Sequence, residues 1–307
     1  MSKLYFTSSK FKSYIPDWIL LLISLILFFK YFEILKPFNR QFYINDPKLL
    51  HPFATIERVT DNQLYIYSTI IPIIIIIIVS IYLRTQRKFK SFENINFEFL
   101  HFLQVSILGL LLSVTLVSII TDILKVWIGN PRPDFIARCG PKSGTPINTL
   151  VDVLDVCTAP IGEIYLLDGM KSTPSGHSSM SFAGLGFLSL WLLDVFNNLN
   201  FINNRDIVDF NNNNPNSNKK SSNFQLIFKI ICILPLIFAS YIALSRTQDY
   251  RHHFFDIIFG GLLGLILCYT IYKKYFGQNG NYTKDIQENS QSPLSSSSTG
   301  SEFFANV

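Results

Sequence analysis

The stretch Tyr65–Leu83, YIYSTIIPIIIIIIVSIYL, decides the fold class. Its run of isoleucines at 73–78 would suit a buried β-strand, but it lies inside a much longer apolar segment, which favours a membrane helix. Because lipid offers no hydrogen-bond partners, a spanning segment must satisfy its backbone polar groups internally, and a lone strand does not. This stretch is therefore predicted to cross a membrane as an α-helix.

Five further apolar runs are long enough, or nearly so, to cross a hydrocarbon core about 30 Å thick. The chain has 307 residues, of which 49% are hydrophobic and 15% charged, whereas soluble domains carry about 25% charged residues. The expected spans are residues 18–35, 65–83, 100–120, 178–195, 224–244 and 254–275. The sequence predicts an all-α, polytopic membrane protein with six transmembrane helices.

The positions of the basic residues predict the orientation. The short connection after the second span carries Arg84, Arg87, Lys88 and Lys90, a pattern typical of cytoplasmic loops. The first span lacks a cleavage site at its end and is expected to be retained. Both termini are therefore predicted to be cytoplasmic, and the connections after the third and fifth spans to lie on the lumenal or extracellular side. The net charge of +5 reflects this orientation rather than affinity for nucleic acid, and oligomeric state leaves no signal.

Composition divides the chain into three parts: a cytoplasmic N-terminus over 1–16, a six-helix membrane domain over 17–276, and a disordered cytoplasmic tail over 277–307. An asparagine-rich segment, 203–223, is predicted to be a disordered cytoplasmic loop. The glycosylation sequon at Asn281 would face the cytoplasm and stay unmodified.

Cys139 and Cys157 share the long non-cytoplasmic loop, where oxidation is permitted. Their spacing does not establish that they are close, so a disulfide and two free thiols both stay open. Cys232 and Cys268 lie in apolar runs and are expected to be packing residues.

The first polar segment follows the third apolar run and contains Lys125 and Arg132. Lysine is a flexible point charge, whereas the planar arginine fork suits two-point contact with an oxyanion. Pro131 and Pro133 fix the backbone on both sides of the arginine. Taken alone, this segment would pass for a lysine reaching the membrane surface and an arginine in a proline-rich turn.

The second segment, Pro174-Ser175-Gly176-His177, precedes the fourth apolar run. Ser175 is a candidate N-cap, and Gly176 would let a ligand approach the backbone. The first N–H groups of the helix would then point at an anion, and His177 could give a proton to a leaving oxygen. An ordinary helix cap beside a half-buried histidine is the alternative.

The third segment contains Arg246, His252 and Asp256 at the start of the sixth span. The histidine and aspartate are four residues apart, so on a helix they would share a face. A carboxylate that holds one imidazole nitrogen leaves the other free as a nucleophile. An ionisable residue inside an apolar run is costly and usually functional. Since all three segments are expected on one membrane face, together they predict a site for a phosphate ester.

In order and spacing, Lys125-x6-Arg132-Pro133, Pro174-Ser175-Gly176-His177 and Ser245-Arg246-x5-His252-x3-Asp256 match the three-part signature of the type 2 phosphatidic acid phosphatase, or lipid phosphate phosphatase, superfamily. The chain resembles this family over about residues 60–275, and looks closest to its plant and fungal branch, which acts on phosphatidate and diacylglycerol pyrophosphate. The family also includes vanadium haloperoxidases, but six spans exclude a soluble member.

The resemblance implies a role for each matched residue. His252 would attack phosphorus and form a phosphohistidine, oriented by Asp256, and His177 would protonate the leaving lipid oxygen. Oxygens of the phosphate would be held by Lys125, Arg132, Ser175, Gly176 and Arg246. The resemblance implies that the reaction needs no metal or cofactor, as in the phosphatases of this family, and the sequence shows no carboxylate cluster suited to magnesium.

Three functions stay open at this point. The first is a phosphatase for phosphatidate, lysophosphatidate and diacylglycerol pyrophosphate, with membrane lipids as its surroundings. The second is a specialised phosphatase for sphingoid-base, polyprenyl or sugar phosphates. The third, an inactive relative acting as a scaffold or transporter, would require a lost catalytic residue, and none is missing.

Overall fold

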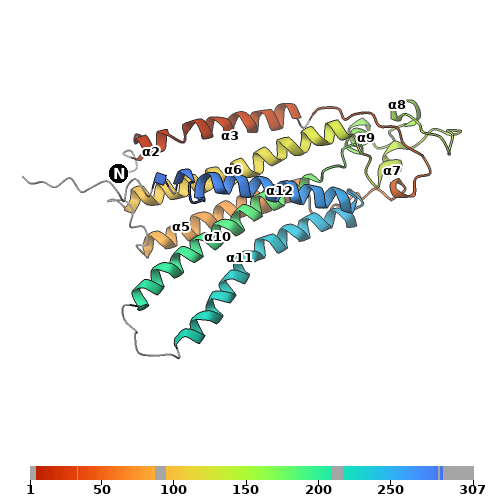
Figure 1. The fold of residues 1–307 in the computed structure, drawn as a ribbon. Coiled ribbons are helices and arrows are strands. Elements are labelled where there is room, and N and C mark those ends of the chain that lie inside the picture. The colour runs from red at the N-terminus through yellow and green to blue at the C-terminus, as the bar shows by residue number, and fades with distance from the viewer. Residues whose placement is uncertain (1–4, 33, 87–94, 209–216, 283, 286–307) are drawn as a thin grey trace, which may run out of the picture.

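The computed structural model describes residues 5–32, 34–86, 95–208, 217–282 and 284–285. In this part of the chain six helices are long and apolar enough to cross a membrane, which confirms the predicted fold class. They span Ser9–Phe32, Asp61–Thr85, Ile95–Ile128, Gly176–Asn197, Leu226–Gln248 and Phe254–Phe276. They lie side by side as an elongated bundle (Figure 1).

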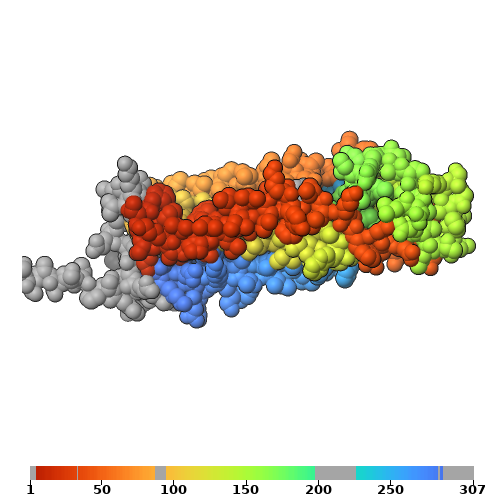
Figure 2. Space-filling view, turned by 90° about the horizontal axis from the view of Figure 1, so that it is seen from above, coloured from red at the N-terminus to blue at the C-terminus, as the bar shows by residue number. Residues whose placement is uncertain are grey.

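The first two spans each join several helical segments. The first combines α2 (Ser9–Lys12), α3 (Ile15–Leu27) and the π-helix η1 (Phe28–Phe32), and the second combines α4 (Asp61–Tyr65), the π-helix η3 (Ile66–Ile70) and α5 (Ile71–Thr85). The other four are α6 (Ile95–Ile128), α10 (Gly176–Val208), α11 (Ser217–Gln248) and α12 (Phe254–Phe276). Space-filling atoms of the first span run along one face of the bundle (Figure 2).

Helix α6 continues eight residues beyond the expected end of the third span, so that Lys125 lies on the helix rather than in the loop after it. The sequence suggested a break because Thr121 and Asp122 interrupt the apolar run. Inside the bundle, however, Thr121 is buried and shares a 2.8 Å hydrogen bond with the Ser179 hydroxyl. The helix ends at Gly129, where φ is +57° and a Cβ atom would lie 2.1 Å from the Phe38 carbonyl oxygen, a conformation and contact that only glycine tolerates.

Helices α10 and α12 approach closely through two glycines one turn apart. A Cβ atom on Gly260 would lie 2.5 Å from the Ser175 carbonyl oxygen, and one on Gly264 would lie 2.4 Å from that of Ser179. Small residues four apart allow such backbone contact between membrane helices. The Ser178 hydroxyl adds a 2.7 Å hydrogen bond to the Ile257 carbonyl. This contact brings the second and third polar segments together.

The connections 37–60 and 129–175 form a cap over one end of the bundle, which contains η2 (Pro47–Leu49), α7 (Phe135–Cys139), α8 (Val153–Val156) and α9 (Glu163–Asp168) (Figure 1). An antiparallel bridge joins Phe42 to Val151. The cap has its own apolar core, formed by Phe42, Leu49, Phe135, Cys139, Val151, Val153, Val156, Leu166 and Met170. Cys139 and Cys157 form a disulfide within it, which answers the question that the sequence left open, whereas Cys232 and Cys268 are free and buried.

The start of the C-terminal tail packs against the opposite end of the bundle, where the sequence predicted disorder from residue 277. Tyr282 is buried, with its ring 5.5 Å from that of Phe102. Asp285 accepts hydrogen bonds from Lys10 at 2.7 Å and Tyr14 at 2.9 Å. Tyr282 and Asp285 therefore act as anchors in a segment whose composition alone suggested a free tail.

Helices α10 and α11 extend into both ends of the predicted asparagine-rich loop over 203–223. Its centre, 209–216, and most of the predicted tail, 286–307, lie outside the described residues.

The disulfide closes a segment with a sequence separation of 18 residues, for which loop-closure entropy alone gives a stabilisation of about 3 kcal/mol. We expect the paired change Cys139→Ser and Cys157→Ser to make the cap at least tenfold more sensitive to limited proteolysis, because the cap core would open more often. Cys232→Ala, which removes a free thiol in the membrane, serves as the control. Equal proteolysis rates in both variants would contradict a stabilising role for the bond.

Candidate active site

The eight predicted site residues gather where the bundle meets the cap. Lys125 lies at the end of α6, Arg246 at the end of α11, and Ser175 to His177 at the start of α10. His252 lies in the bend between α11 and α12, and Asp256 in the first turn of α12. Arg132 follows the glycine that ends α6. The Lys125 side chain is partly buried, and the other side chains of this set are buried. Gly176 lies against the Lys125 ammonium.

Asp256 joins the second polar segment to the third. Its carboxylate accepts hydrogen bonds from the Ser172 hydroxyl at 2.6 Å, from the Thr173 hydroxyl, and from the His253 backbone N–H at 2.9 Å. Its own carbonyl accepts the Ser175 N–H at 3.0 Å. Ser175 in turn caps α10, as predicted, by accepting the Ser178 N–H.

His252 is oriented through a backbone carbonyl rather than by direct contact with Asp256. Its Nδ1 lies 2.8 Å from the Ser172 carbonyl oxygen but 3.9 Å from the Asp256 carboxylate. A carbonyl oxygen only accepts, so Nδ1 carries the proton and Nε2 keeps its lone pair. This differs from the expected shared helix face, because the helix begins only at Phe254 and His252 lies before it.

Asp256 therefore acts on His252 indirectly, by holding the segment that contains Ser172. Burial lowers the pKa of His252 well below the ordinary histidine value, and the charges of Arg132 and Arg246 lower it further. The imidazole stays neutral at physiological pH, as a nucleophile requires.

His253, rather than His252, lies within hydrogen-bond distance of the Asp256 carboxylate. Its Nδ1 lies 3.2 Å from the Asp256 carboxylate, and it is the N-cap residue of α12. Its side chain is 29% exposed against 3% for His252. The two adjacent histidines thus divide their tasks between capping a helix and facing the cation cluster.

His177 lies at the opening of α10, and its Nε2 donates to the Val59 carbonyl at 2.9 Å. Arg246 donates to the same oxygen through Nη1 at 3.0 Å. The two groups are therefore neighbours. A leaving oxygen that takes the Nε2 proton must replace the Val59 carbonyl as its partner.

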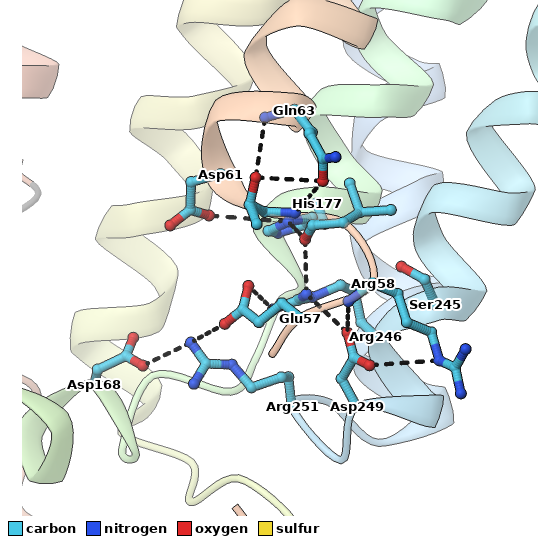
Figure 3. Close-up of polar contacts among 12 residues, drawn as sticks. Glu57, Arg58, Asp61, Gln63, Asp168, His177, Ser245, Arg246, Asp249 and Arg251 are labelled. Carbon is cyan, nitrogen blue, oxygen red and sulfur yellow. Dashed lines mark hydrogen bonds and ion pairs between the residues drawn. The ribbon is translucent and has the colours of Figure 1, made fainter. Parts of the chain in front are cut away.

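Three arginines and two carboxylates alternate around the site, and we refer to Arg132, Asp168, Arg251, Glu57 and Arg246 as the ion-pair ring. Asp168 binds Arg132 at 2.7 Å and Arg251 at 3.2 Å. Glu57 binds Arg251 at 3.1 Å and Arg246 at 3.2 Å. Figure 3 shows Arg251 between the two carboxylates, with dashed lines to both.

Each arginine of the ring keeps one donor without a partner. The Nε atoms of Arg132, Arg246 and Arg251 are buried and have no hydrogen-bond partner among the described residues. A buried donor left unpaired costs about 1–3 kcal/mol, so an anion that accepts these N–H groups would recover that cost. Burial lowers the pKa of Arg132 to about 9, with Asp168 opposing the shift, and the guanidinium stays charged.

Lys125 and the start of α10 complete the cation cluster. The Lys125 ammonium lies 3.1 Å from the place where a Cβ atom of Gly176 would be, so a side chain there would crowd it. The ammonium is 3.6 Å from Asp122, one turn earlier on α6. Backbone N–H groups at a helix start favour a bound anion, and the glycine keeps this surface open.

The sequence did not reveal several residues that hold this site. Asp168 and Glu57 come from the cap, where no motif marks them, and Arg251 occupies a position that the third motif leaves unspecified. Arg138 supports Asp168 at 3.0 Å and is itself paired with Asp134 at 2.8 Å. The i, i+4 spacing of Asp134 and Arg138, which favours an ion pair on a helix, was the one sequence signal for this group of residues. Among the described residues no cluster of three or more His, Cys, Asp or Glu side chains could hold a metal ion.

Comparisons with known proteins identify relatives of this chain. The chain is 41% identical over 263 residues to diacylglycerol pyrophosphate phosphatase 1 of Saccharomyces cerevisiae, covering 85% of this chain and 79% of that protein. It is 34% identical to the probable diacylglycerol pyrophosphate phosphatase 1 of Schizosaccharomyces pombe, with 88% and 84% covered. It is 31% identical to lipid phosphate phosphatase 2 of Arabidopsis thaliana, with 85% and 76% covered.

No solved structure matches the chain at a significant level. Residues 106–279 match the PAP2 superfamily, and this segment contains all eight predicted site residues. With the relatives above, this match confirms the predicted resemblance: the chain belongs to the PAP2 superfamily.

Proposed function

We propose that this protein is an integral-membrane lipid phosphate phosphatase that hydrolyses phosphatidate, lysophosphatidate or diacylglycerol pyrophosphate. The observation that carries the proposal is His252, whose Nε2 lone pair is left free by the Ser172 carbonyl within a cluster of cations. The names of the relatives, diacylglycerol pyrophosphate phosphatase and lipid phosphate phosphatase, support the substrate class.

In the proposed reaction Nε2 of His252 attacks phosphorus, a P–N bond forms, and the bond from phosphorus to the lipid oxygen breaks. His177, protonated once the negatively charged phosphate is bound, gives the departing oxygen its proton and then regains one from the attacking water. Water then attacks the phosphohistidine, which releases inorganic phosphate and restores the free imidazole. For a monoester such as phosphatidate the balance is one ester plus one water to one alcohol plus one phosphate, with no other reactant.

Charge stabilisation in the transition state would come from groups that are already in place. Arg132 and Arg246 offer buried Nε–H donors, Lys125 offers its ammonium, and Gly176 and Ser175 offer the backbone N–H and hydroxyl at the helix start. Preorganised donors of this kind usually supply the largest part of catalysis, since they need no reorganisation during the reaction.

The proposal places the site and the cap on the lumenal or extracellular side, with both termini in the cytoplasm. Basic residues at 84–90 support this orientation, and the Cys139–Cys157 disulfide suits an oxidising compartment.

Orientation can be tested in the cap with one substitution. Leu150→Thr turns exposed Asn148, followed by Thr149, into a glycosylation acceptor. We expect this variant to gain an endoglycosidase-sensitive mass shift when it is made in a eukaryotic membrane. Adding Asn148→Gln should remove the shift. An unmodified Leu150→Thr protein that still folds and turns over would contradict a lumenal cap.

The nucleophile can be tested by phosphate release from phosphatidate in detergent micelles with EDTA present. We expect His252→Ala to lower kcat at least 1000-fold, because no other group attacks phosphorus. His253→Ala, the matched control, should keep kcat within about tenfold, since that histidine caps α12. EDTA should leave wild-type turnover unchanged.

Loss of wild-type turnover in EDTA would contradict the metal-free reaction, and a larger loss in His253→Ala than in His252→Ala would reverse the assignment. If the wild type leaves phosphatidate, lysophosphatidate and diacylglycerol pyrophosphate intact, a panel of sphingoid-base, polyprenyl and sugar phosphates tests the hypothesis of a specialised phosphatase.

A further inference from the structure

Arg251 is part of the ion-pair ring but occupies a position that the three-part signature leaves unspecified, and its donor has no use in the reaction described above. Its Nη2 is shared between Glu57 at 3.1 Å and Asp168 at 3.2 Å. Its Nε is buried without a hydrogen-bond partner among the described residues. The guanidinium is therefore fixed by two carboxylates while one N–H group stays available to an anion.

The three arginines of the ring lie at different depths. Their side chains are 2% exposed at Arg246, 5% at Arg132 and 12% at Arg251. The carboxylates on either side of Arg251 are more open still, at 20% for Glu57 and 34% for Asp168. Arg251 thus lies between the deep pair of arginines and the surface.

This order determines what each arginine can contact. The attacked phosphorus must lie at His252, whose side chain is 3% exposed. In phosphoryl transfer the leaving oxygen lies roughly in line with the nucleophile, on the far side of phosphorus. The leaving oxygen therefore lies on the side of phosphorus away from buried His252, where His177 gives it a proton, and the group beyond that oxygen extends toward the more open part of the ring, where Arg251 lies.

A lipid alkoxide leaving group carries no oxyanion for this arginine, whereas a second phosphoryl group does. We propose that Arg251 forms a second phosphate subsite, which holds the inner phosphoryl group of a lipid diphosphate while the terminal phosphoryl group is attacked by His252. This inference rests on the proposed function and narrows it to substrates of the lipid diphosphate class.

Electrostatics supports the assignment. Burial alone would raise the pKa of Asp168, but the charges of Arg132 and Arg251 outweigh it and hold that pKa well below the usual range. Two ionised carboxylates would repel an inner phosphate that passes between them. Arg251, paired with both, removes this repulsion and offers Nε–H in its place.

In this reaction the bond between the terminal phosphorus and the bridging oxygen breaks, and the bridging oxygen leaves with its electron pair on the lipid phosphate. Water then cleaves the P–N bond of the phosphohistidine. One lipid diphosphate and one water give one lipid monophosphate and one inorganic phosphate.

The test compares kcat/KM for diacylglycerol pyrophosphate and for phosphatidate in the same micelles. Arg251→Gln should lower kcat/KM for the diphosphate at least about tenfold more than for the monophosphate, as expected for one charged hydrogen bond. Arg251→Lys should lie between it and the wild type, because the charge stays while the fork is lost. The ratio of the two substrates is independent of how much of each variant folds.

Arg58→Gln is the matched control. Arg58 also lies at the site and pairs with a carboxylate, that of Asp249 at 3.5 Å, but its side chain is 56% exposed and lies outside the ring. We expect its substrate ratio to equal that of the wild type. Inhibition of phosphatidate hydrolysis by inorganic pyrophosphate should weaken at least about tenfold in Arg251→Gln, and inhibition by inorganic phosphate much less.

An unchanged substrate ratio in both Arg251 variants overturns the subsite, whatever the loss of total activity. So does a wild type that hydrolyses phosphatidate but not the diphosphate, and in either case the phosphatase itself stands. A wild type that hydrolyses neither lipid contradicts the proposed function instead.

Discussion

The site depends on the buried carboxylate of Asp256. An ionised carboxylate out of water costs several kcal/mol unless its oxygens are hydrogen-bonded. Here the cost is offset by the hydroxyls of Ser172 and Thr173 and by the backbone N–H of His253, the N-cap residue of α12. These hydrogen bonds hold the segment before α10 against the start of α12. They therefore also fix the Ser172 carbonyl, which determines which nitrogen of His252 carries the proton.

The contact of α10 with α12 makes this arrangement possible. Backbone atoms of Ser175 and Ser179 lie where side chains at Gly260 and Gly264 would otherwise be. The helices are thereby close enough for carboxylate, hydroxyl and imidazole groups to meet within hydrogen-bond distance. On the other side, the ion-pair ring holds three guanidinium groups apart from one another while leaving an Nε donor on each. Donors held in place in this way suit a bound anion, because they need no reorganisation to receive it.

The sequence predicted the six spans and the residues of the motifs, and the features of the site that it missed have physical causes. Long apolar runs predicted the six spans, and the three motifs predicted that their residues come together. Both signals could be found because each is a continuous stretch of sequence. The expected hydrogen bond from His252 to Asp256 goes instead to the Ser172 carbonyl, and the two side chains lie 3.9 Å apart, because His252 lies before the first residue of α12, Phe254. Glu57 and Asp168 could not be found from sequence, because each reaches the site through the folding of the cap over the bundle and no local pattern records that. The packed segment that ends at Asp285 was missed for a similar reason: its partners lie near the other end of the chain.

The central claim is that the Ser172 carbonyl holds the Nδ1 proton of His252 and leaves Nε2 to attack phosphorus. The most direct test is to trap the phosphoenzyme during turnover of phosphatidate, quench it in alkali, and identify the phosphorylated residue by mass spectrometry and the phosphorylated nitrogen by phosphorus and nitrogen NMR. We expect phosphate on His252, bonded to Nε2. Phosphate on Nδ1 of His252, or on His253, would contradict it.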